Sequence, residues 1–137
     1  MREIKFRGKR DNGEWAYGSL CIRPDGSEEI VQIEDFPCLG GIMQKVAMHD
    51  EVDPETVGQY TGLKDKNGVE VYEGDILGGI LECCYVGYCD RCKSFQVFNP
   101  LHECMACKGN FHWAELVYDA EIIQLGNIYE NPELLND

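Results

Sequence analysis

Basic residues are scarce in this sequence, and it contains no long apolar run. Twelve Lys and Arg stand against twenty-five Asp and Glu, so the 137 residues carry a net charge of −13. A charge of this sign repels nucleic-acid backbones, whose binding depends on Lys and Arg at the phosphates. The longest uncharged apolar run, residues 76–81, is too short to cross a bilayer. Because no apolar stretch follows the basic N-terminus, we expect no signal peptide, no membrane association and a cytoplasmic location.

Motifs that carry catalysis are also missing. The sequence has no Walker-type phosphate loop, no G-x-G-x-x-G, no H-E-x-x-H and no nucleophile elbow. Its three serines, Ser19, Ser27 and Ser94, lie far apart in the chain and suggest no triad. We interpret His49, which is followed by two acidic residues, as a solvated loop histidine. We therefore expect that the protein is not an enzyme.

Strand patterns dominate the first half of the chain. Alternating apolar and basic residues at 4–7 and a turn at 11–13 predict a hairpin over residues 4–22, and residues 29–34 predict a third strand. Between residues 35 and 49 the pattern blurs, and Gly40 and Gly41 interrupt it. Residues 52–56 predict a single helical turn, with Asp53 as N-cap and Pro54 at the first helical position. Further strand patterns follow, so we expect a mostly β protein with a β-rich subdomain at 1–52 and a second domain at 53–137.

Two C-x-x-C pairs, eleven residues apart, make up the clearest motif: Cys89 with Cys92, and Cys104 with Cys107. A tight turn lets both thiolates of a pair point at one ion, and two pairs complete a tetrahedral site without a position for water or substrate. The spacing predicts a small zinc ribbon at residues 83–113, inserted in the second domain and holding a structural Zn²⁺. Iron bound by the same thiolates, as in rubredoxin, is the alternative.

Other cysteines and histidines lie near these pairs or elsewhere in the chain. The sequence leaves open whether four neighbours of the pairs touch the metal: Cys83, Cys84, His102 and His112. We expect one of the first two, and also Cys21 and Cys38, to be small buried hydrophobes. Without a secretion signal, all eight cysteines are expected to be thiols or metal ligands and not disulfides.

Charge separates the cysteine segment from the remainder of the chain. Residues 83–113 carry a net charge of +1, which leaves −14 for the other residues. The cations Arg91, Lys93 and Lys108 could therefore contact phosphates, and neighbouring aromatic side chains could stack on bases: Phe95, Phe98, Phe111 and Trp113. Aromatic residues in so small a module are more often its core, so nucleic acid is the less favoured partner.

Three segments, "MREIKFR", "VDPETVGQYTGLKDKNGVEVYEGDIL" and "LGNIYENPELL", resemble the YopX family of phage and prophage proteins. The resemblance implies a mostly β protein whose second half is an SH3-like β-barrel, encoded by a phage or prophage in a bacterial host. It implies no activity and no catalytic residues. The cysteine pairs depart from the family's pattern, so the metal site depends on their spacing alone.

These observations predict an accessory protein of unknown activity, most simply a zinc-stabilised, non-enzymatic protein-interaction module. The expected partner is a host or phage protein. The alternatives are nucleic-acid binding through the zinc ribbon, and an acidic mimic of DNA that occupies a basic partner. The sequence leaves the oligomeric state open.

Overall fold

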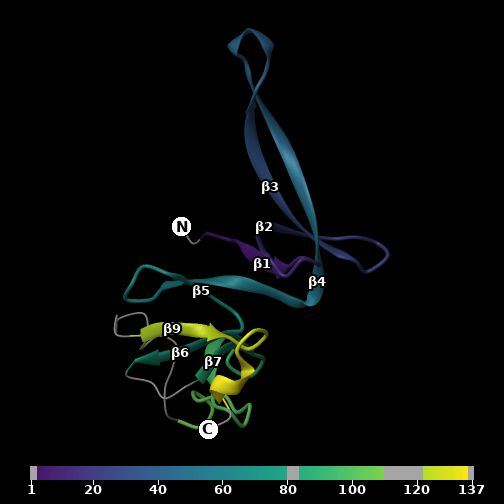
Figure 1. The fold of residues 1–137 in the computed structure, drawn as a ribbon. Helices are drawn as coiled ribbons and strands as arrows, with labels where there is room; N and C mark the ends of the chain where they lie inside the picture. Colours follow the sequence, from purple (N-terminus) through teal and green to yellow (C-terminus); the bar gives the residue numbers. More distant parts are fainter. Residues whose placement is uncertain (1–2, 80–83, 110–121, 136–137) are drawn as a thin grey trace. The chain divides into compact units, whose positions relative to one another are not determined.

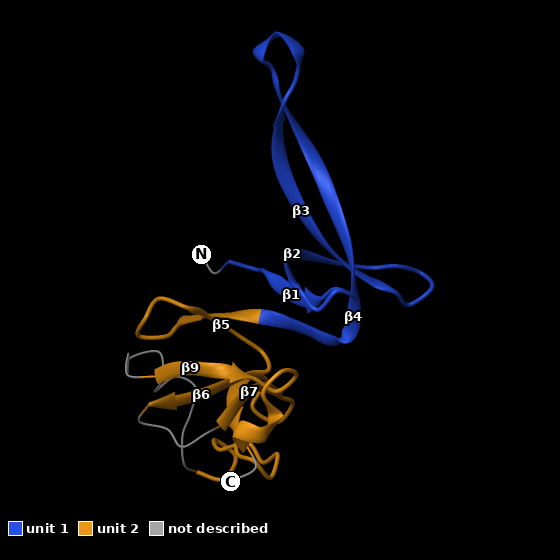
Figure 2. Ribbon diagram, viewed as in Figure 1, with its two compact units in different colours: residues 1, 3–59 blue, residues 2, 60–137 orange. Residues whose placement is uncertain are grey.

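The computed structural model describes residues 3–79, 84–109 and 122–135, and it is mostly β, as predicted. The chain divides into two compact units, Glu3–Gln59 and Tyr60–Asp137 (Figure 2). The strand β4 (Met43–Lys64) continues through the point of division. The predicted boundary at residue 52 stays a prediction. Within the described ranges, no helix is long and apolar enough to cross a membrane.

Four antiparallel strands form the first unit: β1 (Phe6–Lys9), β2 (Trp15–Ile22), β3 (Glu28–Pro37) and the first part of β4. The pairings β1–β2, β2–β3, β3–β4 and β1–β4 form a closed cycle, and the hairpin predicted over residues 4–22 is confirmed. The buried centre is small. It contains Ala16, Ile30 and Val52, with Phe6, Leu20 and Val57 packed against them.

The sequence does not predict the longest element of this unit, the hairpin of β3 and β4. These strands pair from Glu28–Val52 out to Pro37–Met43. Because β2 pairs with β3 only over residues 28–31, the outer part extends beyond β1 and β2 as a two-stranded ribbon (Figure 1). We call residues 32–48 the arm. The glycines that interrupt the sequence pattern form its turn, where Gly40 and Gly41 have φ of 83° and 78°.

The helical turn predicted at residues 52–56 is wrong, because this segment belongs to β4. Asp53 does accept a hydrogen bond from the Glu55 N–H at 3.1 Å, as an N-cap would. The chain nevertheless stays extended and pairs with β1, with a register shift between Arg7 and Lys9. Pro54, which has no N–H for the ladder, lies in this irregular part. An isolated helical turn is marginal in water, so pairing with β1 prevails over the local signal.

The second unit contains β5 (Glu70–Tyr72), β6 (Asp75–Gly79), β7 (Cys84–Cys89), β8 (Ser94–Phe98), β9 (Ile122–Asn127) and the short η2 (Pro132–Leu135). β5 pairs with the end of β4, and the other strands form an antiparallel sheet in the order β8-β7-β6-β9. Within the described ranges this sheet is open, so closure of the expected SH3-like barrel is not part of the described fold. The core combines residues from most of these strands: Val71, Leu77, Cys84, Val86, Val97 and Ile122.

A buried aspartate joins a turn of the second unit to its last strand. One carboxylate oxygen of Asp65 accepts from the N–H groups of Asn67 and Val69, both at 2.9 Å. The other accepts from the Gln124 N–H in β9 at 3.0 Å. Burial alone would raise the pKa of Asp65, but these three backbone donors hold it below its ordinary value.

A glycine in the bend before β6 allows close packing with the chain's last segment. Gly74 has φ of 92°, and a Cβ at this position would lie 2.8 Å from the ring of Tyr129. The Gly74 N–H donates to the Val86 carbonyl at 2.8 Å, and its carbonyl accepts from the Ile128 N–H at 2.8 Å. The segments around Gly74 and Tyr129 belong to the motifs that carry the family resemblance, and here they have a structural role.

Candidate metal centre

The four paired cysteines come from two loops around the β7–β8 hairpin. Cys89 ends β7, and Cys92 lies in the turn that leads to β8. After β8, a turn in which the Asn99 side chain accepts from the Glu103 N–H at 3.0 Å reverses the chain. Cys104 then forms an isolated β-bridge with Phe98. The chain thus runs back along β8, which brings the second cysteine pair to the first.

Both C-x-x-C loops are closed by the same backbone hydrogen bond. The residue after each pair donates its N–H to the carbonyl of the pair's first cysteine: Lys93 to Cys89 at 2.8 Å, and Lys108 to Cys104 at 3.2 Å. Lys93 has φ of 55°, a left-handed conformation that is uncommon for a residue with a side chain. This shared closure directs both thiols of each loop toward one point.

The structure places the predicted ligand atoms at the spacing that a metal needs. The Sγ atoms of the four cysteines all lie within 4.8 Å of one another. Cys107 Sγ is 3.6 Å from Cys89 Sγ and 3.7 Å from Cys92 Sγ, and Cys92 Sγ is 4.0 Å from Cys104 Sγ. Four sulfurs at the Zn–S distance of about 2.3 Å in a tetrahedron are about 3.8 Å apart. The four cysteines could therefore hold one metal ion.

The thiols differ in acidity because their backbone donors, burial and neighbouring thiols differ. The Cys92 N–H donates to Cys89 Sγ and, with a contribution from Cys107, lowers the pKa of Cys89 to about 7. Burial raises the pKa of Cys92 to about 12, and the neighbouring Cys89 raises the pKa of Cys107. One thiolate therefore forms near neutral pH and opposes the ionisation of the others. A bound cation would remove this opposition and release the remaining protons.

Two neighbours of the cysteine pairs lie outside the cluster. Cys84 is buried among core residues such as Val71 and Leu77 and serves as a small hydrophobe. His102 Nδ1 lies 2.8 Å from the Tyr85 hydroxyl, and its ring packs edge-on against that of Tyr85. Cys83 and His112 fall outside the described residues.

The prediction that Cys21 and Cys38 are buried is wrong, because both are exposed. Cys21 lies near the end of β2, and Cys38 lies in the turn of the arm. Cys21 follows Leu20, which packs against the buried centre, and successive residues of a strand point to opposite faces. Residues 33–45, which include Cys38, are all exposed. Residue type alone therefore does not establish that a cysteine is covered.

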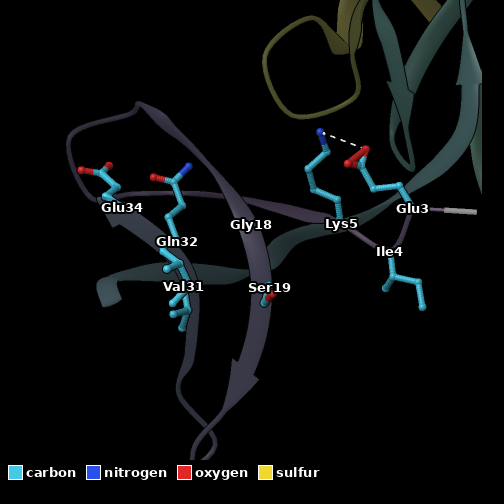
Figure 3. Close-up of a pocket in the computed structure, with 9 residues that line it drawn as sticks. Glu3, Ile4, Lys5, Gly18, Ser19, Val31, Gln32 and Glu34 are labelled. Atoms are coloured by element: carbon cyan, nitrogen blue, oxygen red, sulfur yellow. Dashed lines mark ion pairs between the residues drawn. The ribbon is translucent and has the colours of Figure 1, made fainter. Parts of the chain in front are cut away.

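A shallow groove of about 420 Å³ lies in the first unit, apart from the cysteine cluster. Figure 3 shows Gln32 and Glu34 on one side of it, and Glu3 with Lys5 on the other. Glu3 and Lys5 form an ion pair at 3.5 Å. Ser19 also lines the groove, but neither His49 nor another serine does.

The arm is a surface feature that the sequence pattern does not predict. Its exposed apolar side chains include Ile33, Phe36 and Leu39. A signal was present in the sequence, since residues 36–44 contain no charged residue in a strongly acidic chain. Two adjacent glycines between apolar stretches are also a hairpin signal.

Comparison with known proteins places this fold in a family. Residues 5–136 match the family described as YopX protein. The crystal structure of protein EF1440 from Enterococcus faecalis is similar, with a TM-score of 0.61 and 28% sequence identity over 98% of this chain and 99% of that chain. No curated protein matches the chain. Because the family match covers nearly the whole length and confirms the resemblance of the three sequence segments, the chain belongs to the YopX protein family.

Proposed function

We propose that this protein is a zinc-stabilised, non-enzymatic protein-interaction module, encoded by a phage or prophage and acting in the bacterial cytoplasm. The observation that carries the proposal is the cluster of four cysteine Sγ atoms within 4.8 Å. An ion bound by four thiolates has no open position for water or substrate, so its contribution is structural. Zn²⁺ accepts a tetrahedral set of thiolates without any redox role, and Cys89, Cys92, Cys104 and Cys107 would hold it.

The charge of the chain favours a protein as the partner over a nucleic acid. Outside residues 83–113 the net charge is −14. Within that segment, Lys108 Nζ is paired with Glu103 at 3.0 Å, which reduces the charge offered to phosphates. Phe95 is buried, and Phe98 stacks on Tyr85 with ring centres 5.4 Å apart. Phe95 is therefore covered, and Tyr85 occupies one face of the partly buried Phe98. Phe111 and Trp113 fall outside the described residues.

Metal analysis combined with affinity capture tests the proposal. We expect the purified chain to contain one zinc ion per molecule and no iron. A tagged chain should then retain a discrete protein from bacterial lysate, and nuclease treatment should leave that recovery unchanged.

A double variant, Arg91→Ala with Lys93→Ala, provides the matched control because it removes two exposed cations next to the cluster. We expect it to capture the same protein as the unmodified chain. Recovery that requires nucleic acid and disappears in this variant would instead identify the cysteine segment as a nucleic-acid surface. Iron in the purified chain would contradict the zinc assignment.

A further inference from the structure

The arm concentrates exposed apolar side chains over a short length of chain. Six large apolar residues within it are 41% to 99% exposed: Ile33, Phe36, Leu39, Ile42, Met43 and Met48. Over the rest of the described chain, the exposed large apolar residues are spread from Ile4 to Leu125. A contiguous group of exposed apolar side chains is typical of a protein–protein contact, whereas scattered ones need no explanation.

Both faces of the arm share this character. Residues directly opposite each other in an antiparallel pair lie on the same face. Pro37 and Met43 are opposite each other, so they lie on one face, and the neighbouring pair of Phe36 and Gln44 lies on the other. All the residues of the described arm except Val46 and Gln32 are exposed, so neither face covers a core. An isolated two-stranded hairpin is only marginally stable in water, so burial of these side chains against another surface would stabilise the arm.

The outer part of the arm is electrically neutral. Residues 36–44 contain no charged side chain. The charges next to this stretch, Asp35 and Lys45, are opposite each other in the strand pair and form an ion pair at 3.0 Å. The arm therefore ends in an apolar, uncharged surface on a chain whose net charge is −13.

We propose that two copies of this chain associate through their arms. Contact between most other surfaces would bring two strongly negative molecules together, which costs free energy. The neutral ends of the arms can meet without opposing like charges, and an apolar surface is complementary to itself in a two-fold contact. A basic partner would find no carboxylate within residues 36–44, and the adjacent Asp35 is already paired with Lys45. Two-fold association of identical arms therefore matches both the apolar character and the charge of this surface.

Molar mass measured by sedimentation equilibrium over a wide range of protein concentration tests this association in the full chain. We expect a dimer of the 15.6 kDa chain at high concentration that dissociates on dilution. Because the contact is apolar and the two copies repel each other elsewhere, added salt should strengthen the dimer. A contact made by opposite charges would weaken instead.

The informative variant is Leu39→Ser with Ile42→Ser, which changes two residues around the turn that are 99% and 67% exposed. We expect its dissociation constant to rise at least tenfold, with an unchanged circular dichroism spectrum. The matched control is Ile4→Ser with Ile22→Ser, at residues that are 67% and 66% exposed in the same unit. It should dimerise like the unmodified chain.

Three results would overturn the proposal. One is an unmodified chain that stays monomeric at every concentration, which would leave the arm to a different partner. Another is an arm variant that dimerises as strongly as the unmodified chain. The third is loss of the dimer in the control variant, which would place the contact outside the end of the arm, at Ile22 or at the groove that Ile4 lines together with Ile33 (Figure 3).

Discussion

Replacement of Cys104 and Cys107 by serine removes two of the four clustered thiols, and we expect the metal to be lost with them. The loops that the thiols hold, residues 90–93 and 100–109, should then become disordered. The sheet should persist, because Val86 of β7 and Val97 of β8 are buried in the core of the second unit together with Leu77. The first unit should be unaffected.

The magnitude follows from the length of these loops. They comprise fourteen residues, and ordering a backbone costs about 1 kcal/mol per residue, or about 14 kcal/mol in all. Structural zinc sites contribute about 10–16 kcal/mol of apparent binding free energy. Since the two quantities are similar, a bound metal would offset the entropy cost of ordering the loops and would contribute little to the stability of the remaining fold. Loss of the ion should therefore be a local event.

Amide hydrogen exchange distinguishes local from global loss of structure. The amides of Lys93, Met105 and Lys108 donate to carbonyls in or beside the loops, and we expect their protection to disappear. The Gly74 amide donates to Val86 and the Ile128 amide donates to Gly74, at the bend before β6, and both amides should stay protected. Metal analysis of the same sample should show no bound ion.

The matched control is Cys21→Ser with Cys38→Ser, the same chemical change at two exposed cysteines outside the cluster. It should keep its metal and all of its protection. One ion per chain in the double variant at Cys104 and Cys107 would contradict the assignment of these residues as ligands. Loss of protection at Gly74 and Ile128 would show instead that the loops are required for the whole unit.

Two further predictions concern the second unit. In a denaturant titration, Gly74→Ala should lower the free energy of unfolding by about 2–4 kcal/mol, because the new side chain combines positive φ with a clash against Tyr129. The control Gly68→Ala has a similar φ but open space around it, so it should lower the free energy of unfolding by only about 1 kcal/mol. Asp65→Asn should lower the free energy of unfolding by about 2 kcal/mol at neutral pH, because the side-chain NH2 group would replace one accepting oxygen and leave a backbone N–H without its acceptor. The lowered pKa of Asp65 contributes stability above the unfolded value of about 4 that is lost as pH falls through the folded value. Lowering the pH should therefore reduce the free energy of unfolding less in Asp65→Asn than in the unmodified chain. The control Asp25→Asn, in an exposed turn, should have the same free energy of unfolding as the unmodified chain at neutral pH.

The parts of the fold that the sequence predicts are those whose signals are local. The hairpin of β1 and β2 is expected because its alternation and its turn residues lie within a few positions of each other. The cysteine cluster is expected for the same reason, since a C-x-x-C loop by itself directs two thiols to one point. The later meeting of two such loops requires only that a turn reverse the chain between them.

The parts that the sequence does not predict depend on distant contacts or on solvent. Residues 52–56 carry a local helix signal that pairing with β1 overrides. The arm gives no alternating pattern because neither of its faces covers a core, and period-two alternation arises only when one face is buried. The exposure of Cys38 has the same origin, whereas Cys21 lies on the face of β2 opposite Leu20, which packs against the buried centre. A pattern of apolar residues cannot distinguish a side chain that is covered by the same molecule from one that another molecule would cover.

The strand order of the second unit has a consequence for the order in which its parts fold. β7 and β8 join residues 5 to 13 positions apart, from Cys89–Ser94 to Tyr85–Phe98. β6 and β9 join residues 43 to 52 positions apart, from Gly79–Ile122 to Asp75–Asn127. Because a short loop costs less entropy to close than a long one, β7 and β8 can pair before β9 docks on β6. A metal ion bound at that stage would close the loops around β7 and β8, so the chain would present a preformed ribbon to which β9 has only to dock.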